Sequence, residues 1–145
     1  MTVTMPPSLT ASTGMDALSH CLESYVSTVE HPLGDLLSLY GIGLAGQNLR
    51  RAVADGNDTE ARRNMAMASL VGGMSLNLKW GGACHSLGHQ LSSVAGISHG
   101  VSIALMLPHQ MEFSLPGNLE KYAKVAETLG EIMRAASLEE RAMGA

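Results

Sequence analysis

Aromatic and basic residues are scarce in this chain. Its 145 residues include only three Tyr, one Trp and one Phe. Single-stranded nucleic acids are usually bound by stacking bases on aromatic side chains, so binding of this kind is disfavoured. Nine Lys and Arg stand against thirteen Asp and Glu, which gives a net charge of −4, whereas a surface that binds phosphate backbones would be basic. We therefore expect no nucleic-acid partner.

Cysteines and long apolar runs are also few. Cys21 and Cys84 form neither a disulfide framework nor a CxxC metal motif, and we predict that both are buried thiols in a reducing cytoplasm. The longest apolar run, Ile103 to Leu107, is far too short to span a bilayer. The first eight residues lack the basic and apolar regions of a signal peptide. These absences predict a cytoplasmic chain with no membrane partner.

Helical spacing of apolar residues is what the sequence has in abundance. Apolar residues make up 46% of the chain, which is enough for the core of one domain. Thr2–Met5 alternates like a short strand that Pro6 and Pro7 end, and after it the apolar period is helical. We predict an all-α domain, bundle-like, with one short N-terminal strand.

The expected helices are bounded by capping residues, prolines and glycines. Thr13 is the cap expected for the first helix, and Pro32 suits the first turn of the second. Asp58 or Thr59 caps the third helix, which Gly81 and Gly82 interrupt. The remaining segments are a helix that carries His85 and His89 and stops before Gly96, an apolar segment from His99 ended by Pro108, a helix over Leu119–Leu129, and a marginal helix in Ser137–Ala145.

One glycine pattern matches a nucleotide-binding fingerprint. Gly41–Gly46 reads GxGxxG, with Glu60 nineteen residues after Gly41. In that fingerprint the acidic residue follows a second strand, but the segment 52–59 is polar and turn-like, and Glu60 opens a helical pattern. We therefore interpret the glycines as sites where helices pack closely over small residues.

Two pairs of possible metal ligands occur at helical spacing. Asp16 and His20 are four residues apart, as are His85 and His89, and His99 follows. Residues four apart project from the same face of a helix, so each pair can close on one small ion. The spacing alone predicts that two helices and a following turn supply imidazoles and a carboxylate to one metal site.

The sequence around these residues resembles that of the iron-containing (group III) alcohol dehydrogenases. The resemblance runs from about Met5 to Gly130, and two long motifs occur in the right order and separation. The first motif is Thr13–Glu23 (TGMDALSHCLE), and the second is Gly82–Leu91 (GACHSLGHQL) followed by Ser98–Gly100 (SHG) and Ala104–His109 (ALMLPH).

The resemblance implies a role for each candidate residue. Asp16, His20, His85 and His99 would be the metal ligands, whereas His89 would lie between the metal and the nicotinamide and relay a proton. The resemblance thus implies that His89 is both a catalytic and a cofactor-binding residue. It does not imply that His85 and His89 bind one ion together. One carboxylate and three neutral imidazoles suit ferrous iron or zinc.

The implied activity is metal-dependent, NAD(P)-linked oxidation of a small alcohol to an aldehyde or ketone, or the reverse. The cation stabilises the alkoxide, which gives up hydride more readily than a neutral alcohol does. A relative of maleylacetate reductase or glycerol dehydrogenase is an alternative on the same fold. The second alternative is a non-catalytic helical fragment that oligomerises.

The resemblance also implies how the domains are organised. Residues 1–145 would be the helical, metal-binding C-terminal domain of a dehydroquinate synthase-like dehydrogenase, with the nucleotide-binding domain absent and the C-terminal end truncated. An apolar face left by the missing domain predicts a homo-oligomer. Trp80 is a candidate for lining the substrate pocket. For Glu23, support of the metal site and a solvated salt bridge are both open.

Overall fold

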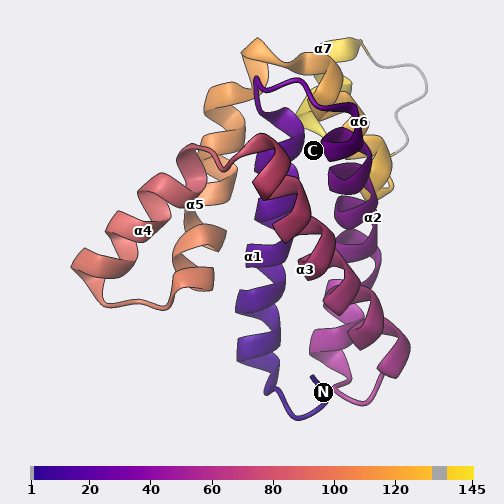
Figure 1. Cartoon of the computed structure of the whole chain (residues 1–145), viewed down its shortest axis with the longest axis vertical. Coiled ribbons are helices and arrows are strands. Elements are labelled where there is room, and N and C mark those ends of the chain that lie inside the picture. Colours follow the sequence, from indigo (N-terminus) through magenta and orange to yellow (C-terminus); the bar gives the residue numbers. More distant parts are fainter. Residues whose placement is uncertain (1, 132–136) are drawn as a thin grey trace.

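The structure, a computed structural model, describes residues 2–131 and 137–145, and every regular element in these ranges is helical (Figure 1). This confirms the all-α class. No helix in these ranges is both long and apolar enough to cross a membrane. The helices are α1 (Pro7–Val26), α2 (Pro32–Ala54), α3 (Thr59–Lys79), α4 (Ala83–Ala95), α5 (His99–Ser114), the short 3-10 helix η1 (Leu115–Gly117), α6 (Leu119–Leu129) and α7 (Leu138–Met143).

The short strand expected at the N-terminus is wrong. Residues 2–5 form a turn, in which the backbone N–H of Met5 donates to the carbonyl oxygen of Thr2 at 3.1 Å. Four alternating residues with no partner strand to pair with do not form a sheet. The expected cap Thr13 lies inside α1, because the helix already begins at Pro7, whose ring suits the first helical position.

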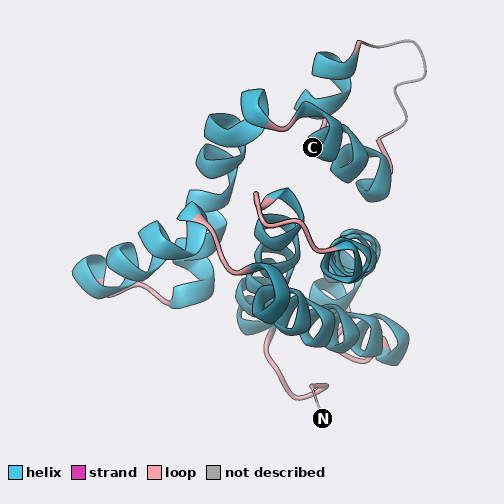
Figure 2. Cartoon of the chain, turned by 45° about the horizontal axis from the view of Figure 1, so that its top comes forward, coloured by secondary structure: helices cyan, strands magenta, loops and turns pink. Residues whose placement is uncertain are grey.

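Helices α1, α2 and α3 form the main bundle, and two helix pairs are added to it (Figures 1 and 2). The α4–α5 pair lies to one side of the bundle, where α5 packs on α1 and α4 packs mainly on α5. The α6–α7 pair covers one end, with α6 on α2. The α6–α7 pair therefore closes the core, and the α4–α5 pair brings new side chains to the side of α1.

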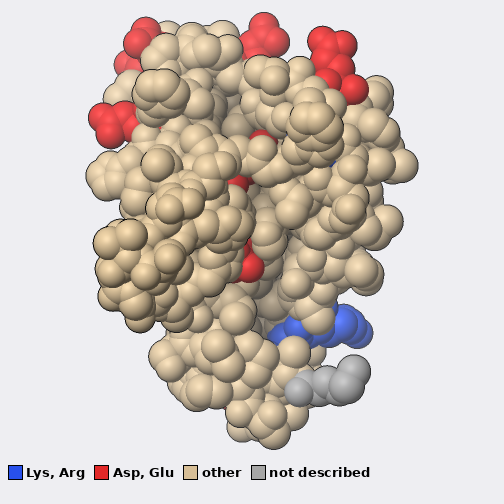
Figure 3. Space-filling view, turned by 60° about the vertical axis from the view of Figure 1, so that its left-hand side comes forward, with Lys and Arg blue, Asp and Glu red and all other residues tan. Residues whose placement is uncertain are grey.

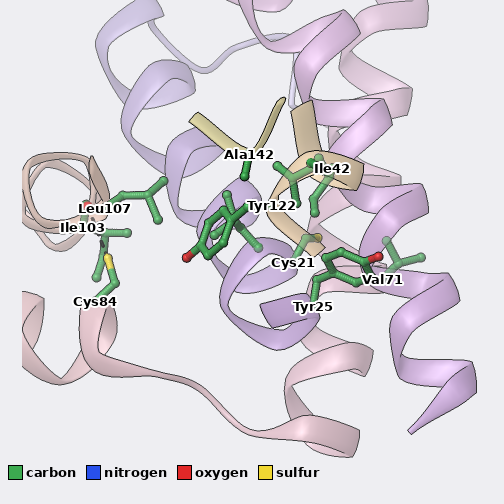
Figure 4. Packing of buried hydrophobic residues seen from close by; sticks show 12 residues of the cluster. Cys21, Tyr25, Ile42, Val71, Cys84, Ile103, Leu107, Tyr122 and Ala142 are labelled. Atoms are coloured by element: carbon green, nitrogen blue, oxygen red, sulfur yellow. Dashed lines mark hydrogen bonds between the residues drawn. The ribbon is translucent and has the colours of Figure 1, made fainter. Parts of the chain in front are cut away.

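The apolar core runs between α1 and the helices that surround it (Figure 4). Leu22, Ile42 and Ile103 are almost fully buried in it. Cys21 and Cys84 are fully buried free thiols, as predicted, and burial raises the pKa of each to about 12. Both cysteines therefore serve as small apolar residues.

The glycines of the GxGxxG pattern lie within α2 and bring helices together. A Cβ on Gly41 would lie 2.3 Å from Sγ of Cys21 on α1, and one on Gly46 would lie 2.7 Å from Cδ2 of Leu129 on α6. The residues directly before the pattern, from Pro32 on, belong to α2 rather than to a strand, which confirms the helix-packing interpretation.

An ion pair with one fully buried partner lies at the end of α3, where the connection to α4 begins. Lys79, the last residue of α3, is fully buried and pairs with Asp35 on α2. Its ammonium group also lies 3.4 Å from the carbonyl oxygen of Tyr25, which accepts a second hydrogen bond, of 2.7 Å, from Lys121 on α6. Two cations and one carboxylate thus fix the start of the α3–α4 connection. The sequence alone did not predict this pair.

Replacing Gly41 with Ala should destabilise the fold, because the added methyl group would meet Cys21 and Val71 at 2.3 and 2.9 Å. Overpacking costs about 1–3 kcal/mol and outweighs the gain in helix propensity of about 1 kcal/mol. Gly73→Ala on α3 is the matched control, since its Cβ would meet nothing within 4 Å, and it should stabilise slightly. Urea denaturation measures both changes; a Gly41→Ala variant as stable as Gly73→Ala would contradict this packing.

Candidate metal centre

One face of α1 supplies the acidic part of the site. Asp16, His20 and Glu23 follow one another at helical spacing, and a Cβ on Gly72 of α3 would lie only 3.2 Å from Cβ of His20. Helix α3 therefore packs close behind His20 and holds this face of α1 toward α4 and α5.

Helix α4 supplies His85 and His89 from its first two turns. The helix begins after Gly82 and ends at Gly96, whose left-handed conformation (φ 67°) suits glycine. His85 is buried, whereas His89, one turn later, is exposed. The same helix thus presents one imidazole to the interior and one to solvent.

Helix α5 supplies His99 at its first residue. A Cβ on the next residue, Gly100, would lie 2.3 Å from the backbone oxygen of Ser12 on α1. Only glycine permits so close an approach of the two backbones. Because Ser12 is one turn before Asp16 on α1, this contact places His99 beside Asp16.

The side chains converge on the carboxylate of Asp16. Its Oδ1 lies 3.1 Å from Nε2 of His99 and 3.3 Å from Nε2 of His85, and its Oδ2 lies 4.0 Å from Nδ1 of His20. The rings of His20 and His85 stack with their centroids 4.4 Å apart. Asp16, His20 and His85 offer ligand atoms that all lie within 4.8 Å of one another, and His99 joins them through Asp16.

Glu23 lies on the other side of the His85 ring. The Glu23 side chain is 2% exposed, and its carboxylate accepts hydrogen bonds from Nδ1 of His85 and, at 2.7 Å, from the backbone N–H of Cys84. The backbone N–H of His85 is a third donor at 3.4 Å. Glu23 is therefore no solvated salt-bridge partner: it supports the buried histidine from behind.

These contacts shift the pKa values of the cluster. Burial by itself disfavours the charged form of His85, but hydrogen bonds to Asp16 and Glu23 outweigh burial and raise the pKa of His85 to about 9. Burial raises the pKa of Asp16, yet the hydrogen bond from His85 and the neighbouring histidines lower it overall. Burial is the main cause that lowers the pKa of His20. Without a metal, the protonated ring of His85 therefore donates one N–H to each of two carboxylates.

The donor set fits a divalent transition metal. Imidazole nitrogens and one carboxylate oxygen are ligands that suit iron and zinc, and a cation can replace the proton that His85 shares with Asp16. Figure 3, which brings the α4–α5 side forward, shows acidic atoms in a hollow at the middle of this face, among residues other than Lys, Arg, Asp and Glu. The hollow leaves acidic atoms of this face open to solvent.

The structure brings the four residues implied as metal ligands together and leaves His89 at their edge. The ring of His89 lies 6.1 Å from that of His85 and 5.0 Å from that of His99. It is not among the three residues whose ligand atoms lie within 4.8 Å of one another, so equal spacing on α4 does not by itself put His85 and His89 on one ion. Trp80, the candidate for pocket lining, is 73% exposed in the α3–α4 connection.

The sequence alone does not assign a role in the site to Glu23 or to Gly82. The signal for Glu23 was its place seven residues after Asp16, on the same face of α1. Gly82 packs directly against the carboxylate of Glu23, since a Cβ at this position would lie 2.5 Å from Oε1 of Glu23. Only the folded chain brings these two residues together.

Comparisons with known proteins agree on one family. Residues 10–145 match the family model described as "Fe-containing alcohol dehydrogenase family, C-terminal". The 1,3-propanediol dehydrogenase of Klebsiella pneumoniae is 45% identical over 126 residues, which are 87% of this chain and 33% of that protein. The NAD-dependent methanol dehydrogenase of Bacillus methanolicus is 40% identical over 129 residues, or 89% of this chain and 34% of that protein.

A solved structure shows the same arrangement of helices. The crystal structure of a 1,3-propanediol oxidoreductase superposes with a TM-score of 0.96 at 41% identity, over 98% of this chain and 37% of that one. The chain thus spans about a third of the length of the curated relatives that it matches.

Replacing Gly100 with Ala should separate α5 from α1 and His99 from Asp16. The methyl group would meet the backbone oxygen and carbon of Ser12 at 2.3 and 2.6 Å, and backbone cannot move aside as a side chain does. We expect a loss in free energy of unfolding of about 1–3 kcal/mol, measured by urea denaturation. Gly117→Ala, with nothing within 4 Å of its Cβ, is the control and should change little. Equal stability of both variants would refute the close contact.

Proposed function

The chain belongs to the iron-containing alcohol dehydrogenase family, and on this premise we propose that it supplies the metal-binding and substrate-binding half of an NAD(P)-linked alcohol dehydrogenase. The observation that supports the proposal is the convergence of Asp16, His20 and His85, with His99 in contact with Asp16. Ferrous iron is the ion we propose, with zinc as the alternative.

The proposed reaction converts a small alcohol to its aldehyde. When bound by the four side chains, a divalent ion would stabilise negative charge on the alcohol oxygen. The oxidised nicotinamide would accept the hydrogen of the alcohol C–H bond together with its electron pair, as hydride, and the O–H proton would be released to solvent. The relatives named above are called propanediol and methanol dehydrogenases, so we propose a primary alcohol as the substrate class.

His89 is the residue that we propose for carrying the proton outward. It is exposed, and its ring lies 5.0 Å from that of His99, at the edge of the ligand cluster. An imidazole can accept a proton at one nitrogen and donate one from the other, so a ring between the cluster and solvent suits a relay. We also propose that His89 contacts the nicotinamide.

The dinucleotide in this proposal is bound mainly by residues outside these 145. A dinucleotide site is a cleft that needs both of its walls, and the chain matches about a third of each relative. Homo-oligomers through the exposed apolar side chains of this part are a further proposal.

Metal retention tests the ligand set. The chain, stripped of metal and then supplied with Fe(II) without oxygen or with Zn(II), should keep about one equivalent after dialysis, as measured by elemental mass spectrometry. His85→Ala and Asp16→Ala should lose the ion, because each removes a donor from the cluster. His109→Ala is the control: this histidine is exposed on α5 and should leave retention unchanged. Equal retention by all variants would rule out the proposed ligands.

Hydride transfer tests the division of the active site. We expect the 145-residue chain, loaded with metal and given NAD⁺ or NADP⁺ with a primary alcohol, to form no detectable reduced nicotinamide by absorbance. The reason is that a bound metal and substrate do not by themselves hold the dinucleotide in place. Sustained turnover by this chain alone would show that it carries the dinucleotide site as well.

A further inference from the structure

A carboxylate in the protein interior needs hydrogen-bond donors, and those of Glu23 lie on α4. Burying an ionised carboxylate without hydrogen bonds is very costly. Glu23 is 2% exposed and accepts from the backbone N–H of Cys84, from that of His85, and from the imidazole Nδ1 of His85. The two backbone groups are among those at a helix N-terminus that have no partner within the helix. Glu23 therefore acts as the N-terminal cap of a helix 61 residues away in sequence.

The two carboxylates that touch His85 lie at opposite nitrogens. Nδ1 faces Glu23, whereas Nε2 faces Oδ1 of Asp16 at 3.3 Å. A neutral imidazole carries one N–H and one lone pair, and the hydrogen bond made by one nitrogen decides the state of the other. With the proton of Nδ1 donated to Glu23, the lone pair of His85 lies on Nε2, on the side of Asp16, His20 and His99.

We propose that Glu23 is the positioning residue of the metal centre: it selects the tautomer of His85 that can bind an ion and holds the first turn of α4 at that register. This inference rests on the proposed metal site. Glu23 does not itself bind the ion, because its carboxylate lies behind the ring, on the Nδ1 side. Partners of metal-bound histidines typically account for a factor of about 10–100 in metal affinity.

The backbone around Glu23 is shaped for this contact. A Cβ at Gly82 would lie 2.5 Å from Oε1 and 3.2 Å from Cδ of Glu23, so a side chain there would push the carboxylate away from α4. Gly82 is the residue before the first turn of α4, at the point where the carboxylate meets the helix. The contact between Glu23 and α4 therefore requires glycine at position 82.

The variant Glu23→Gln separates positioning from packing, because the shapes of the two side chains match. The amide oxygen can still accept from the N–H of Cys84, but the amide nitrogen donates and turns Nδ1 of His85 into an acceptor. The proton then moves to Nε2 and occupies the lone pair that faces the cluster. Glu30→Gln, in the exposed connection between α1 and α2, is the matched control.

Two measurements on this chain test the proposal. Nitrogen NMR of the metal-free protein, at alkaline pH where the ring is neutral, should show His85 protonated on Nδ1 in the wild type and in Glu30→Gln, but on Nε2 in Glu23→Gln. Zinc affinity should fall by about 10–100-fold in Glu23→Gln and stay at the wild-type value in Glu30→Gln. An unchanged tautomer or an unchanged zinc affinity in Glu23→Gln would overturn the proposal.

A second variant covers the case in which Glu23→Gln does not fold, which circular dichroism would reveal. Gly82→Ala keeps the carboxylate but displaces it, and it should weaken zinc binding in the same direction. Gly81→Ala is its control, since the Cβ would meet only a methyl carbon of Leu76, at 3.3 Å. If the wild type bound neither zinc nor ferrous iron, the proposed function would fail, while the NMR result would still decide the role of Glu23.

Discussion

The hydrogen bonds between Glu23 and the first turn of α4 are the interaction on which the site depends. Helix α4 packs mainly on α5, and only Cys84, His85 and Gly88 of this helix are buried. Its attachment to α1 therefore comes largely from polar contacts, those of Glu23 with the helix N-terminus and of Asp16 with His85. Because apolar burial contributes little there, the polar groups that build the site also dock the helix that carries its central histidine.

Glycines set the distances over which these polar groups meet. Gly100 lets α5 approach the backbone of α1, Gly82 leaves room for the carboxylate of Glu23, and Gly88 faces Ile103, whose Cδ1 would be 2.5 Å from an added Cβ. Each lies within three residues of His85 or His99 along the chain. A methyl group at Gly100 would meet the backbone of Ser12, whereas one at Gly82 or Gly88 would meet the side chain of Glu23 or Ile103. These three glycines thus serve the geometry of the site rather than chain flexibility.

Local signals in the sequence predicted most helix boundaries, and contacts between distant residues explain what they missed. Pro32 begins α2, and α6 covers Leu119–Leu129, because proline, capping and periodicity act within a few residues. Pro108 was expected to end the apolar segment that starts at His99, yet this segment is helix α5, which continues to Ser114, since packing on α1 can outweigh one lost backbone hydrogen bond. The pairing of buried Lys79 with Asp35 joins residues 44 apart, and no local pattern encodes it.

The candidate site divides in the same way. Asp16 and His20 lie on one helix, so their common face follows from spacing alone, whereas the meeting of His85 and His99 with Asp16 requires three helices to pack correctly. The motifs supplied that part through their resemblance to a family. For Glu23, spacing left a solvated salt bridge and a supporting role open, and only its burial against α4 separates the two.

Charge balance explains why such a cluster can exist in a half-buried place. Asp16 and Glu23 bring two negative charges to the two nitrogens of His85, and in the metal-free chain the ring between them, with its pKa raised to about 9, is protonated and donates one N–H to each. A divalent cation next to Asp16 would take over the role of this proton on Nε2, while Nδ1 keeps its own proton for Glu23. With the ion bound, two positive charges face two carboxylates and the imidazoles are neutral. The site then carries little net charge, so Glu23 lowers the cost of holding the ion away from bulk water as well as aiming His85 at it.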